Sequence, residues 1–473
     1  MSDILAEYES LINNPAPLVA DMAALGGRLK YAGFKAQSDR CFEGCVRTLQ
    51  KFIADGNLEA ALRVEQLLYN PMLKTTETEE HYYQCFRQWS PQLQTLGRMR
   101  QRPLRQDRNP RKICFTMHNG VLLGHTEVMF RVIDSWLAQG IECELYLATI
   151  HGANDSFKAL VEQRGIKLIG PVGLERGAAA QNLRELFEAA DIATVVWLSI
   201  PTLASYALAM KLAPRQVFWS VKFHPLWIPE VDVHLCGGQA FETTRNYNGR
   251  DWTVSPFPLT LTPKGNDPAK VKRIREAFPA DAILLGALAR EEKFNSPAYL
   301  DTIGTLLARN PRAYFLWTGR HQPEVVLAAF RKHGVLDRCR FIGWVDTNLV
   351  AEALDVFLET FPFGCGITGF QSMSHGTPLL SYDSPDTLYG YQLQVGVEQQ
   401  FAGGAVPKAQ LETLDILTAA DPEHYLQLAQ KLIDDVAYRR EIGAREQAYF
   451  QGEQEALPRY TKRLWTNISG LPA

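Results

Sequence analysis

Apolar residues in the first hundred positions recur at helical spacing. In CFEGCVRTLQKFIADGNLEAALRVEQLLYN, residues 41–70, they return every three or four positions on both sides of Asp55, Gly56 and Asn57. A glycine between polar residues is typical of a helix end followed by a new start. The pattern predicts two amphipathic helices within an all-helical N-terminal domain, residues 1–110.

From Lys112 onward, short apolar runs alternate with longer helical patterns. The predicted strands of a first set include KICFTM, CELYLATI, KLIGPV, IATVVWLSI and QVFWSV, and those of a second set include AILLGALA, AYFLWTG, RCRFIGWV and PLLSYD. Such alternation is typical of βαβ units and parallel sheets. We expect an α/β protein with two doubly wound lobes, residues 111–262 and 263–473. Ligands are expected at the carboxyl ends of the strands, in a cleft between the lobes.

The segment FPFGCGITGFQSMSHGTPLL, residues 361–380, carries the most informative chemistry. It follows a buried run, and its glycines allow a sharp turn before a helix that is predicted to start near Thr368. The first-turn amides and the helix dipole attract phosphate oxygens, and the threonine hydroxyl adds a donor. The alternative is that the glycines only permit close packing of helix on strand. The predicted phosphate site comprises Gly364, Gly366, Ile367, Thr368 and Gly369.

Two cationic side chains are predicted to face this turn. The first strand of the same lobe ends in ALAREEKFNSP, which places Arg290 and Lys293 at its carboxyl edge, and parallel topology brings such edges to one rim. Fixed cations can neutralise a diphosphate leaving group. Surface ion pairs with Glu291 and Glu292 are the alternative. Because no D-x-D pair ends a strand of the first lobe, we expect no bound metal.

Further groups on this rim are predicted to bind the nucleotide sugar. TGRH contributes a glycine turn and an arginine, and FIGWV offers backbone groups for a base edge and an indole to cover it. The tryptophan is equally suited to the protein core. The residues concerned are Gly319, Arg320, Gly343, Trp344 and Val345.

These motifs resemble the donor lobe of GT-B glycosyltransferases. More narrowly, KLAPRQVFW followed by HP at 224–225, the EKFN segment, and a C-G-x-T-G turn before G-T-P resemble O-GlcNAc transferase and the bacterial cytoplasmic N-glycosyltransferases that modify adhesins. The resemblance spans roughly 360 residues in order. It implies a GT-B fold, with two Rossmann-like lobes preceded by an all-α domain. It also implies inverting transfer from a UDP-sugar to a polypeptide, without a cofactor.

The resemblance also assigns roles to individual residues. It implies that Lys293 contacts the diphosphate and Thr368 the phosphate, and Asn295 of EKFN joins the donor-binding set. Those enzymes usually carry an acidic residue for the ribose hydroxyls shortly after the turn. Gln371 stands in that stretch here, and we expect it to bond a hydroxyl.

The first lobe offers groups that could accept a proton from the acceptor. HNGVLLGHTE, after the first strand, places His118, His125 and Glu127 in a glycine-containing turn at a helix N-terminus. A structural role, such as capping of the helix by His125, fits the pattern equally well. His224, in KFHPLW, is a candidate for contact with acceptor or sugar.

The amino-acid composition of the chain limits the classes of partner that the protein is expected to bind. The chain has 49 Lys and Arg against 52 Asp and Glu, and its densest basic segment, 98–112, contains two prolines and is interpreted as a linker. We therefore expect no nucleic-acid partner. An acidic N-terminus, the absence of a long apolar run and eight scattered cysteines favour a cytoplasmic protein without a transmembrane segment.

The leading prediction is a glycosyltransferase that acts on protein, and transfer to a glycan or lipid-linked glycan follows closely. A GT-B-type sugar-nucleotide epimerase and a non-catalytic scaffold are the alternatives from other classes. The helical domain is expected to bind a partner, a second subunit or the acceptor.

Overall fold

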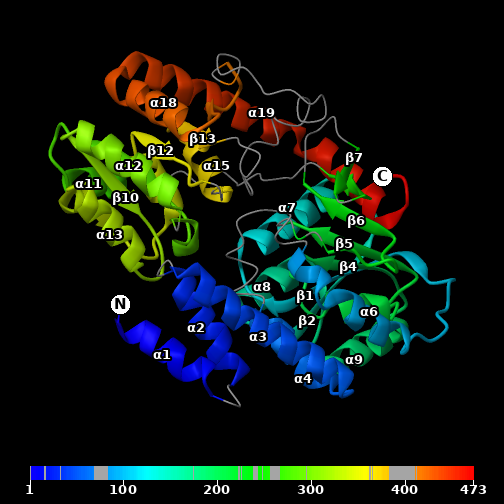
Figure 1. Cartoon of the computed structure of the whole chain (residues 1–473). Helices are drawn as coiled ribbons and strands as arrows, with labels where there is room; N and C mark the ends of the chain where they lie inside the picture. Colours follow the sequence, from blue (N-terminus) through cyan, green and yellow to red (C-terminus); the bar gives the residue numbers. More distant parts are fainter. Residues whose placement is uncertain are drawn as a thin grey trace. The chain divides into compact units, whose positions relative to one another are not determined.

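The computed structural model divides by its contacts into two compact units (Figure 1). The first comprises Met1–Lys30, Phe34–Pro258 and Leu457–Ala473, and the second comprises Tyr31–Gly33 and Leu259–Ala456. The residues that the structure describes are 2–14, 18–31, 34–68, 84–173, 175–221, 224, 226–237, 243–247, 249–255, 267–294, 296–361, 364, 366–382, 411 and 413–473. The predicted division at 1–110, 111–262 and 263–473 stays a prediction.

The first unit is built on an eight-stranded sheet with the order β3-β2-β1-β4-β5-β6-β8-β7, in which β7 alone runs antiparallel to its neighbour. Its strands are β1 (Asn109–Gly120), β2 (Glu144–Ala153), β3 (Lys167–Ile169), β4 (Ile192–Leu198), β5 (Arg215–Ser220), β6 (Val233–Cys236), β7 (Thr244–Tyr247) and β8 (Arg250–Val254). Its helices are α1 (Ser2–Ile12), α2 (Val19–Tyr31), α3 (Lys35–Ala54), α4 (Leu58–Leu68), α6 (Ser90–Arg98), α7 (Gly124–Ala138), α8 (Asp155–Gln163), α9 (Arg176–Ala189) and α10 (Ala204–Ala209).

The central strands of this sheet are apolar throughout because helices cover both faces. Every residue of β4 is buried. On one face Phe115 of β1 packs near Trp136 of α7, and Trp136 in turn meets Trp465 edge to face, with ring centroids 5.3 Å apart. On the other face, Cys114 and Trp197 join a core with the N-terminal helices. Continuous burial of this kind is expected for parallel strands.

The N-terminal helices share one core with this sheet. α3 and α4 are joined at Asp55–Asn57, which confirms the predicted helical pair. Leu49 and Leu62, from these two helices, belong to the same buried cluster as β4. α6 approaches α10 so closely that a Cβ at Gly97 would lie 2.3 Å from the carbonyl oxygen of Tyr206. The helical segment is therefore tightly packed on the first sheet.

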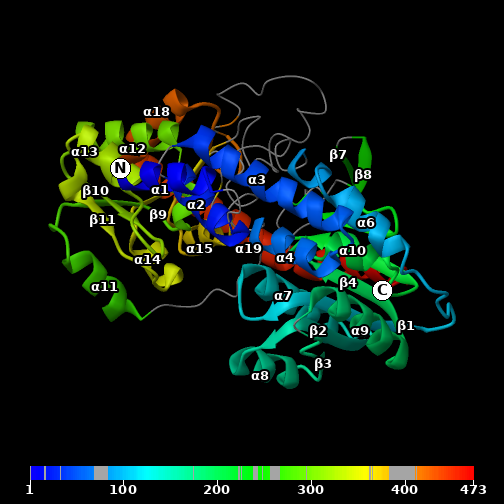
Figure 2. The same cartoon turned by 60° about the horizontal axis from the view of Figure 1, so that its bottom comes forward.

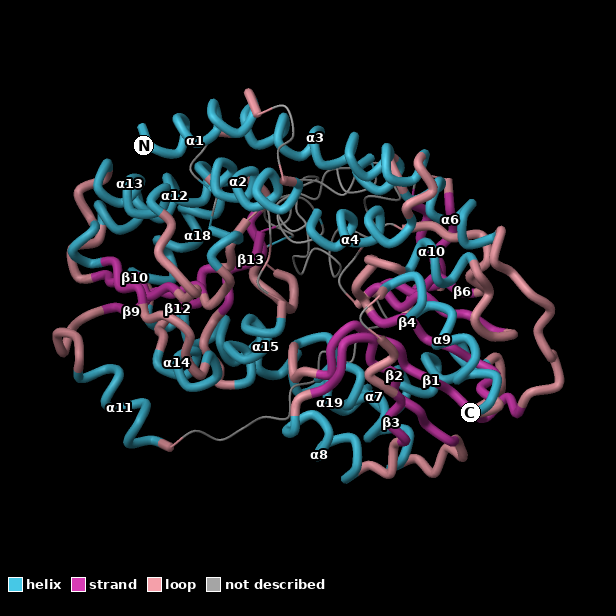
Figure 3. Tube along the Cα trace, turned by 90° about the horizontal axis from the view of Figure 1, so that it is seen from below, coloured by secondary structure: helices cyan, strands magenta, loops and turns pink. Residues whose placement is uncertain are grey.

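The second unit contains an all-parallel sheet with the order β11-β10-β9-β12-β13-β14. Its strands are β9 (Ile283–Ala287), β10 (Ala313–Trp317), β11 (Cys339–Phe341), β12 (Val356–Leu358), β13 (Leu379–Tyr382) and β14 (Thr418–Ala419). Its helices are α11 (Pro268–Glu276), α12 (Pro297–Arg309), α13 (Glu324–Lys332), α14 (Thr347–Ala353), α15 (Ile367–Ser374) and α18 (Pro422–Asp434). Figure 3 shows α12, α13 and α18 on one face, and α11, α14 and α15 on the other.

The C-terminal helix α19 (Val436–Ser469) contributes to both units. The chain passes from the second unit to the first at Leu457, and Pro458 lies inside the helix at that point. Within the first unit the Trp136 indole donates to the carbonyl oxygen of Thr461 at 2.7 Å. Among the helices that the structure describes, none is both long and apolar enough to cross a membrane.

Two buried histidines are expected to make the first unit sensitive to acid. Burial lowers the pKa of His118 to about 4 and that of His234 to about 3, against about 6.5 in an unfolded chain. His234 stacks on Trp227 at 4.0 Å, and its Nε2 accepts the N–H of Ile228 at 3.1 Å, a bond that needs the neutral ring. Below pH 6.5 the unfolded chain therefore binds more protons than the folded one. Burial raises the pKa of Glu65 to about 7, so this carboxyl group binds its proton more tightly in the folded chain. It opposes the effect of the two histidines but is a single group.

We therefore expect the free energy of unfolding of the first unit to fall as the pH drops from about 6.5 to about 4.5. Each unit of lowered histidine pKa corresponds to about 1.4 kcal/mol. Urea unfolding followed by tryptophan fluorescence measures the effect. His234→Asn should reduce the slope, whereas His321→Asn should not, because His321 belongs to the second unit. Equal slopes in the wild type and His234→Asn would contradict the assignment.

Candidate functional site

The glycine bend of the second unit and the lysine predicted to face it lie together. β9 and β12 are neighbours at the point where the strand order of the second sheet changes direction, and such switch points are the usual ligand sites of doubly wound sheets. Lys293 lies in the short 3-10 helix Glu291–Phe294 after β9. Its Nζ donates a hydrogen bond to the backbone carbonyl of Gly364, which follows β12. If an anion binds here, the ammonium group can exchange its hydrogen bond with the carbonyl oxygen for one with a charged oxygen of the anion.

Helix α15 begins directly after this bend. Its N-cap is Gly366, whose φ of +66° lies in the region that favours glycine and whose own residue type offers no capping side chain. Ile367 and Thr368 are the first two helical residues, and Gly369 is buried in the same turn. The first amides of a helix lack partners within the helix and carry the positive end of its dipole. The bend therefore combines a lysine ammonium group with a helix N-terminus.

The second predicted cation, Arg290, lies half-buried just after β9. The acidic residue beside it holds the loops together: Glu291 is 6% exposed, and its Oε2 accepts the backbone N–H of Arg320 at 3.0 Å. Its Oε1 lies 3.6 Å from Nδ1 of His321. Glu291 thus joins the loops that follow β9 and β10. Asn295 and the side chain of Glu292 fall outside the described residues.

The loops after β10 and β11 form the next part of this rim. The N–H of Gly319 donates to the carbonyl of Gly343 at 3.4 Å, and Gly343 has a φ of +69°. Trp344 is 70% exposed, so it is not a core residue, and the Arg320 guanidinium carbon lies 5.8 Å from its ring centroid. Val345 is half-buried against the apolar cluster beneath α14. An exposed indole beside an arginine can cover a flat aromatic ligand.

Gln371 sits on the second turn of α15 and is half-buried. Its Oε1 accepts the hydroxyl of Thr347 at 2.7 Å. The amide oxygen is thus engaged, and the remaining polar group of the side chain is a donor. At this position the chain therefore offers a sugar hydroxyl an amide N–H, together with the oxygen of the threonine hydroxyl.

In the first unit, His118 lies at the corresponding switch point of its sheet. The sequence placed it in a turn, but β1 continues to Gly120, so His118 is part of the strand. Its Nε2 lies 2.8 Å from the carbonyl oxygen of Thr202 and 3.0 Å from the hydroxyl of the same residue, which follows β4. A carbonyl only accepts, so Nε2 carries the proton and Nδ1 holds the lone pair. Burial and the nearby charge of Arg176 lower its pKa.

The other predicted residues of the first unit have different surroundings from those of His118. His125 is buried at the second position of α7, and Thr126, not His125, makes the capping contact by accepting the N–H of Leu123 at 2.8 Å. Glu127 is half-buried in the same first turn. The His224 side chain is buried, and the backbone N–H of His224 donates to the Ser220 hydroxyl at 2.6 Å.

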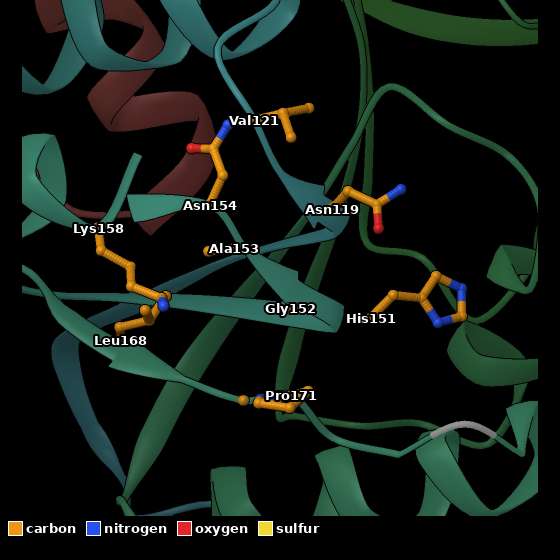
Figure 4. Close-up of a pocket in the computed structure, with 10 residues that line it drawn as sticks. Asn119, Val121, His151, Gly152, Ala153, Asn154, Lys158, Leu168 and Pro171 are labelled. Atoms are coloured by element: carbon orange, nitrogen blue, oxygen red, sulfur yellow. The ribbon is translucent and has the colours of Figure 1, made fainter. Parts of the chain in front are cut away.

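A pocket of about 510 Å³ opens at the carboxyl ends of β1, β2 and β3 (Figure 4). The ring of His151, at the end of β2, lies 5.8 Å from that of His118 and lines this pocket. Figure 4 shows Asn119 and His151 toward one end of the pocket and Lys158 toward the other. His151 was not among the predicted residues, because the order of strands in the sheet decides which strand end lies beside His118. Parallel pairing of β1 with β2 is the signal that could have indicated it.

Within the described part of the chain, no three or more His, Cys, Asp or Glu side chains cluster in a way that could hold a metal ion. The expectation of a metal-free site stays a prediction.

In both sheets the first six strands lie in the order third, second, first, fourth, fifth, sixth, and two such units in tandem define the GT-B fold. The predicted fold class is thereby confirmed. The structure is similar to that of O-GlcNAc transferase from Thermobaculum terrenum, with a TM-score of 0.60 and 15% identity, over 96% of this chain and 89% of that one.

Other solved structures share the two α/β units. HepE from Anabaena, in complex with UDP and glucose, aligns with a TM-score of 0.53 and 14% identity over 76% of this chain and all of that one. A glycosyltransferase from Rickettsia africae aligns with a TM-score of 0.54 and 11% identity over 76% of this chain and 99% of that one. No protein-family model and no curated protein sequence matches the chain. The fold and the resemblance to GT-B glycosyltransferases therefore rest on structure.

Proposed function

We propose that the protein is a glycosyltransferase that uses a nucleotide-diphosphate sugar, with a UDP-sugar as the expected donor. The observation that carries this proposal is the hydrogen bond from Lys293 to Gly364, at the start of a glycine-capped helix. An ammonium group and first-turn amides of a helix are the groups that a diphosphate requires. HepE binds UDP and glucose on the same fold, which supports the class of donor.

The donor site is proposed to work by charge stabilisation. As the anomeric C–O bond breaks, its electron pair moves to the β-phosphate oxygen, and the diphosphate departs with that charge. Lys293, Arg290 and the N-terminus of α15 stabilise it. Trp344 and Arg320 cover the base, while Gln371 with Thr347 binds the ribose. Protein side chains thus do the work that a divalent metal does in other transferases.

The acceptor is proposed to be activated in the first unit. The nucleophile, a hydroxyl or an amide nitrogen, forms the new bond to the anomeric carbon from the face opposite the diphosphate, which inverts the configuration. Its proton passes to Nδ1 of His118. Because the lowered pKa keeps this ring neutral above about pH 4, the lone pair is present throughout the physiological range. A base this weak accepts the proton late, once the nucleophile has begun to bond.

A polypeptide acceptor is proposed, on the strength of the motif resemblance and of the structural likeness to an O-GlcNAc transferase along nearly the whole chain. The alignment with the O-GlcNAc transferase covers 96% of this chain and so includes the N-terminal helices. The alignments with HepE and with the Rickettsia africae enzyme cover 76% of this chain. A glycan acceptor is the competing proposal.

The proposal predicts selective stabilisation by one class of nucleotide sugar. Thermal unfolding should be measured with UDP-, GDP- and dTDP-sugars, and with UMP as the control that lacks the second phosphate. A UDP-sugar should raise the melting temperature, because a ligand that binds only the folded state stabilises it by mass action. UMP should act weakly, since the proposed site is built around a diphosphate. No response to any nucleotide sugar at millimolar concentration would refute the donor proposal.

A further inference from the structure

One buried carboxyl group of the N-terminal helices lies close to the residues that surround His118. Glu65 of α4 is 2% exposed. Its Oε2 accepts the backbone N–H of Leu203 at 2.9 Å, and its Oε1 accepts the indole N–H of Trp89 at 3.4 Å. Leu203 directly follows Thr202, the residue that bonds His118. A side chain of the N-terminal helices is therefore one residue away from the partner of the proposed base.

The conformation of Leu203 shows why this contact is needed. Its φ is +65°, in the left-handed region that side chains other than glycine rarely adopt, at a cost of about 1 kcal/mol or more. Such a conformation persists only when surrounding contacts enforce it. The buried carboxyl group holds the N–H of this residue, and the Leu203 side chain is itself 2% exposed. Without the Glu65 contact, the backbone at 202–203 is free to relax to an ordinary conformation.

The position of Thr202 in turn selects the form of the histidine. Both its carbonyl and its hydroxyl lie within 3.0 Å of Nε2 of His118. The carbonyl requires a proton on Nε2, which leaves the lone pair on Nδ1. A shift of the Thr202 carbonyl would remove this requirement and allow both neutral tautomers.

Helix α4 also bonds to the first residues of helix α9. Glu59 of α4 accepts the backbone N–H of Gly177 at 3.1 Å, and Gln66 accepts a hydrogen bond from Nε of Arg176 at 2.8 Å. Figure 2 shows α4 close to α9, with which it is in contact. Burial, and to a smaller extent the charge of Arg176, lowers the pKa values of His118 and His151. One helix therefore bonds to the N-terminal ends of both α9 and α10.

We propose that Glu65 is a positioning residue: through Leu203 and Thr202 it sets the tautomer of His118 that presents Nδ1 to the acceptor. The inference rests on the proposed role of His118, and it gives the N-terminal helices a part in the acceptor site. The carboxyl group touches no substrate, so its effect is on the state of the histidine ring.

The tautomer can be read directly in the full-length protein. With ring-¹⁵N-labelled histidine, the His118 signals are assigned by their loss in His118→Asn. The wild type should show the form with the proton on Nε2. Glu65→Leu, which removes both acceptors, should shift these signals toward a mixture of the two tautomers. Glu65→Gln, which keeps an oxygen for the Leu203 N–H, should retain the wild-type form.

Kinetics supply the second readout. Glu65→Leu should lower kcat about tenfold or more, as expected when a partner that orients a catalytic histidine is lost, and leave UDP affinity unchanged. Glu65→Gln should restore most of kcat. The matched control is Glu43→Gln on α3, whose side chain is 64% exposed and which should change neither readout.

Each outcome decides the inference. If Glu65→Leu folds and keeps the wild-type His118 signals, the positioning role is overturned. If that variant does not fold, Glu65→Asp serves instead: it keeps the carboxyl group and withdraws the oxygens by one methylene, and unchanged signals there would equally overturn the proposal. A protein without any transferase activity would refute the proposed function, while the ring signals would still decide whether Glu65 sets the tautomer.

Discussion

Lys293→Ala is expected to lower turnover by about 10²-fold to 10³-fold, the usual effect of removing one donor from a site that stabilises developing charge. Affinity for UDP should fall as well, because the diphosphate is present in the ground state. The fold should survive, since the lysine is half-buried and lies at a loop after β9. Turnover with a saturating UDP-sugar and calorimetric titration with UDP measure the two effects.

The control for this change is Lys272→Ala. Lys272 also belongs to the second unit, but its side chain is 75% exposed on α11, where it pairs with Glu276 at 3.5 Å. Its loss should alter neither quantity. Wild-type turnover in Lys293→Ala would remove the proposed diphosphate contact, and with it the main support for the donor site.

His118→Asn is expected to lower turnover by about 10²-fold to 10⁴-fold, the range for loss of a positioned general base. Asparagine keeps a group that can donate to the Thr202 carbonyl, but its amide nitrogen cannot take up a proton. UDP affinity should stay at the wild-type value, because His118 belongs to the first unit and the proposed donor site to the second. The melting temperature should change little at neutral pH.

The pair of variants separates donor from acceptor chemistry. Lys293→Ala should weaken UDP binding and turnover together, whereas His118→Asn should affect turnover alone. His424→Asn offers a matched control, because His424 is a buried histidine of the second unit, on α18. If His118→Asn turns over like the wild type, the proton must pass to another group, and Glu127 and His125 are the candidates to test next.

Local pattern predicted the sheets well because the parallel strands are buried on both faces. β4 and β9 read as unbroken apolar runs, and the helices between strands have clear periodicity. β6, β7 and β8 gave no such signal: they are four or five residues long, and β7, TRNY, is mostly polar. Their pairing depends on distant partners, which the sequence does not encode locally.

The donor site could also be predicted from the sequence, because its residues follow parallel strands. Lys293 and Gly364 each follow a strand end, and parallel topology alone requires those ends to share an edge. The residues around His118 were harder to predict from the sequence. His151 contributes through the pairing of β1 with β2, and Glu65 through the packing of a helix that lies more than a hundred residues before Thr202. Such contacts arise from tertiary packing, for which no local motif exists.

Helix α19 bonds to helix α7 and to strands β5 and β8 of the first unit. Ser135 of α7 bonds the Thr461 hydroxyl at 2.7 Å, Arg215 of β5 donates to the Ile468 carbonyl at 2.6 Å, and Arg463 donates to the Val254 carbonyl at 2.9 Å. During synthesis, the first sheet emerges from the ribosome some two hundred residues before these partners do. The apolar surface around Trp136 therefore stays uncovered until the segment Leu457–Ala473 has been made.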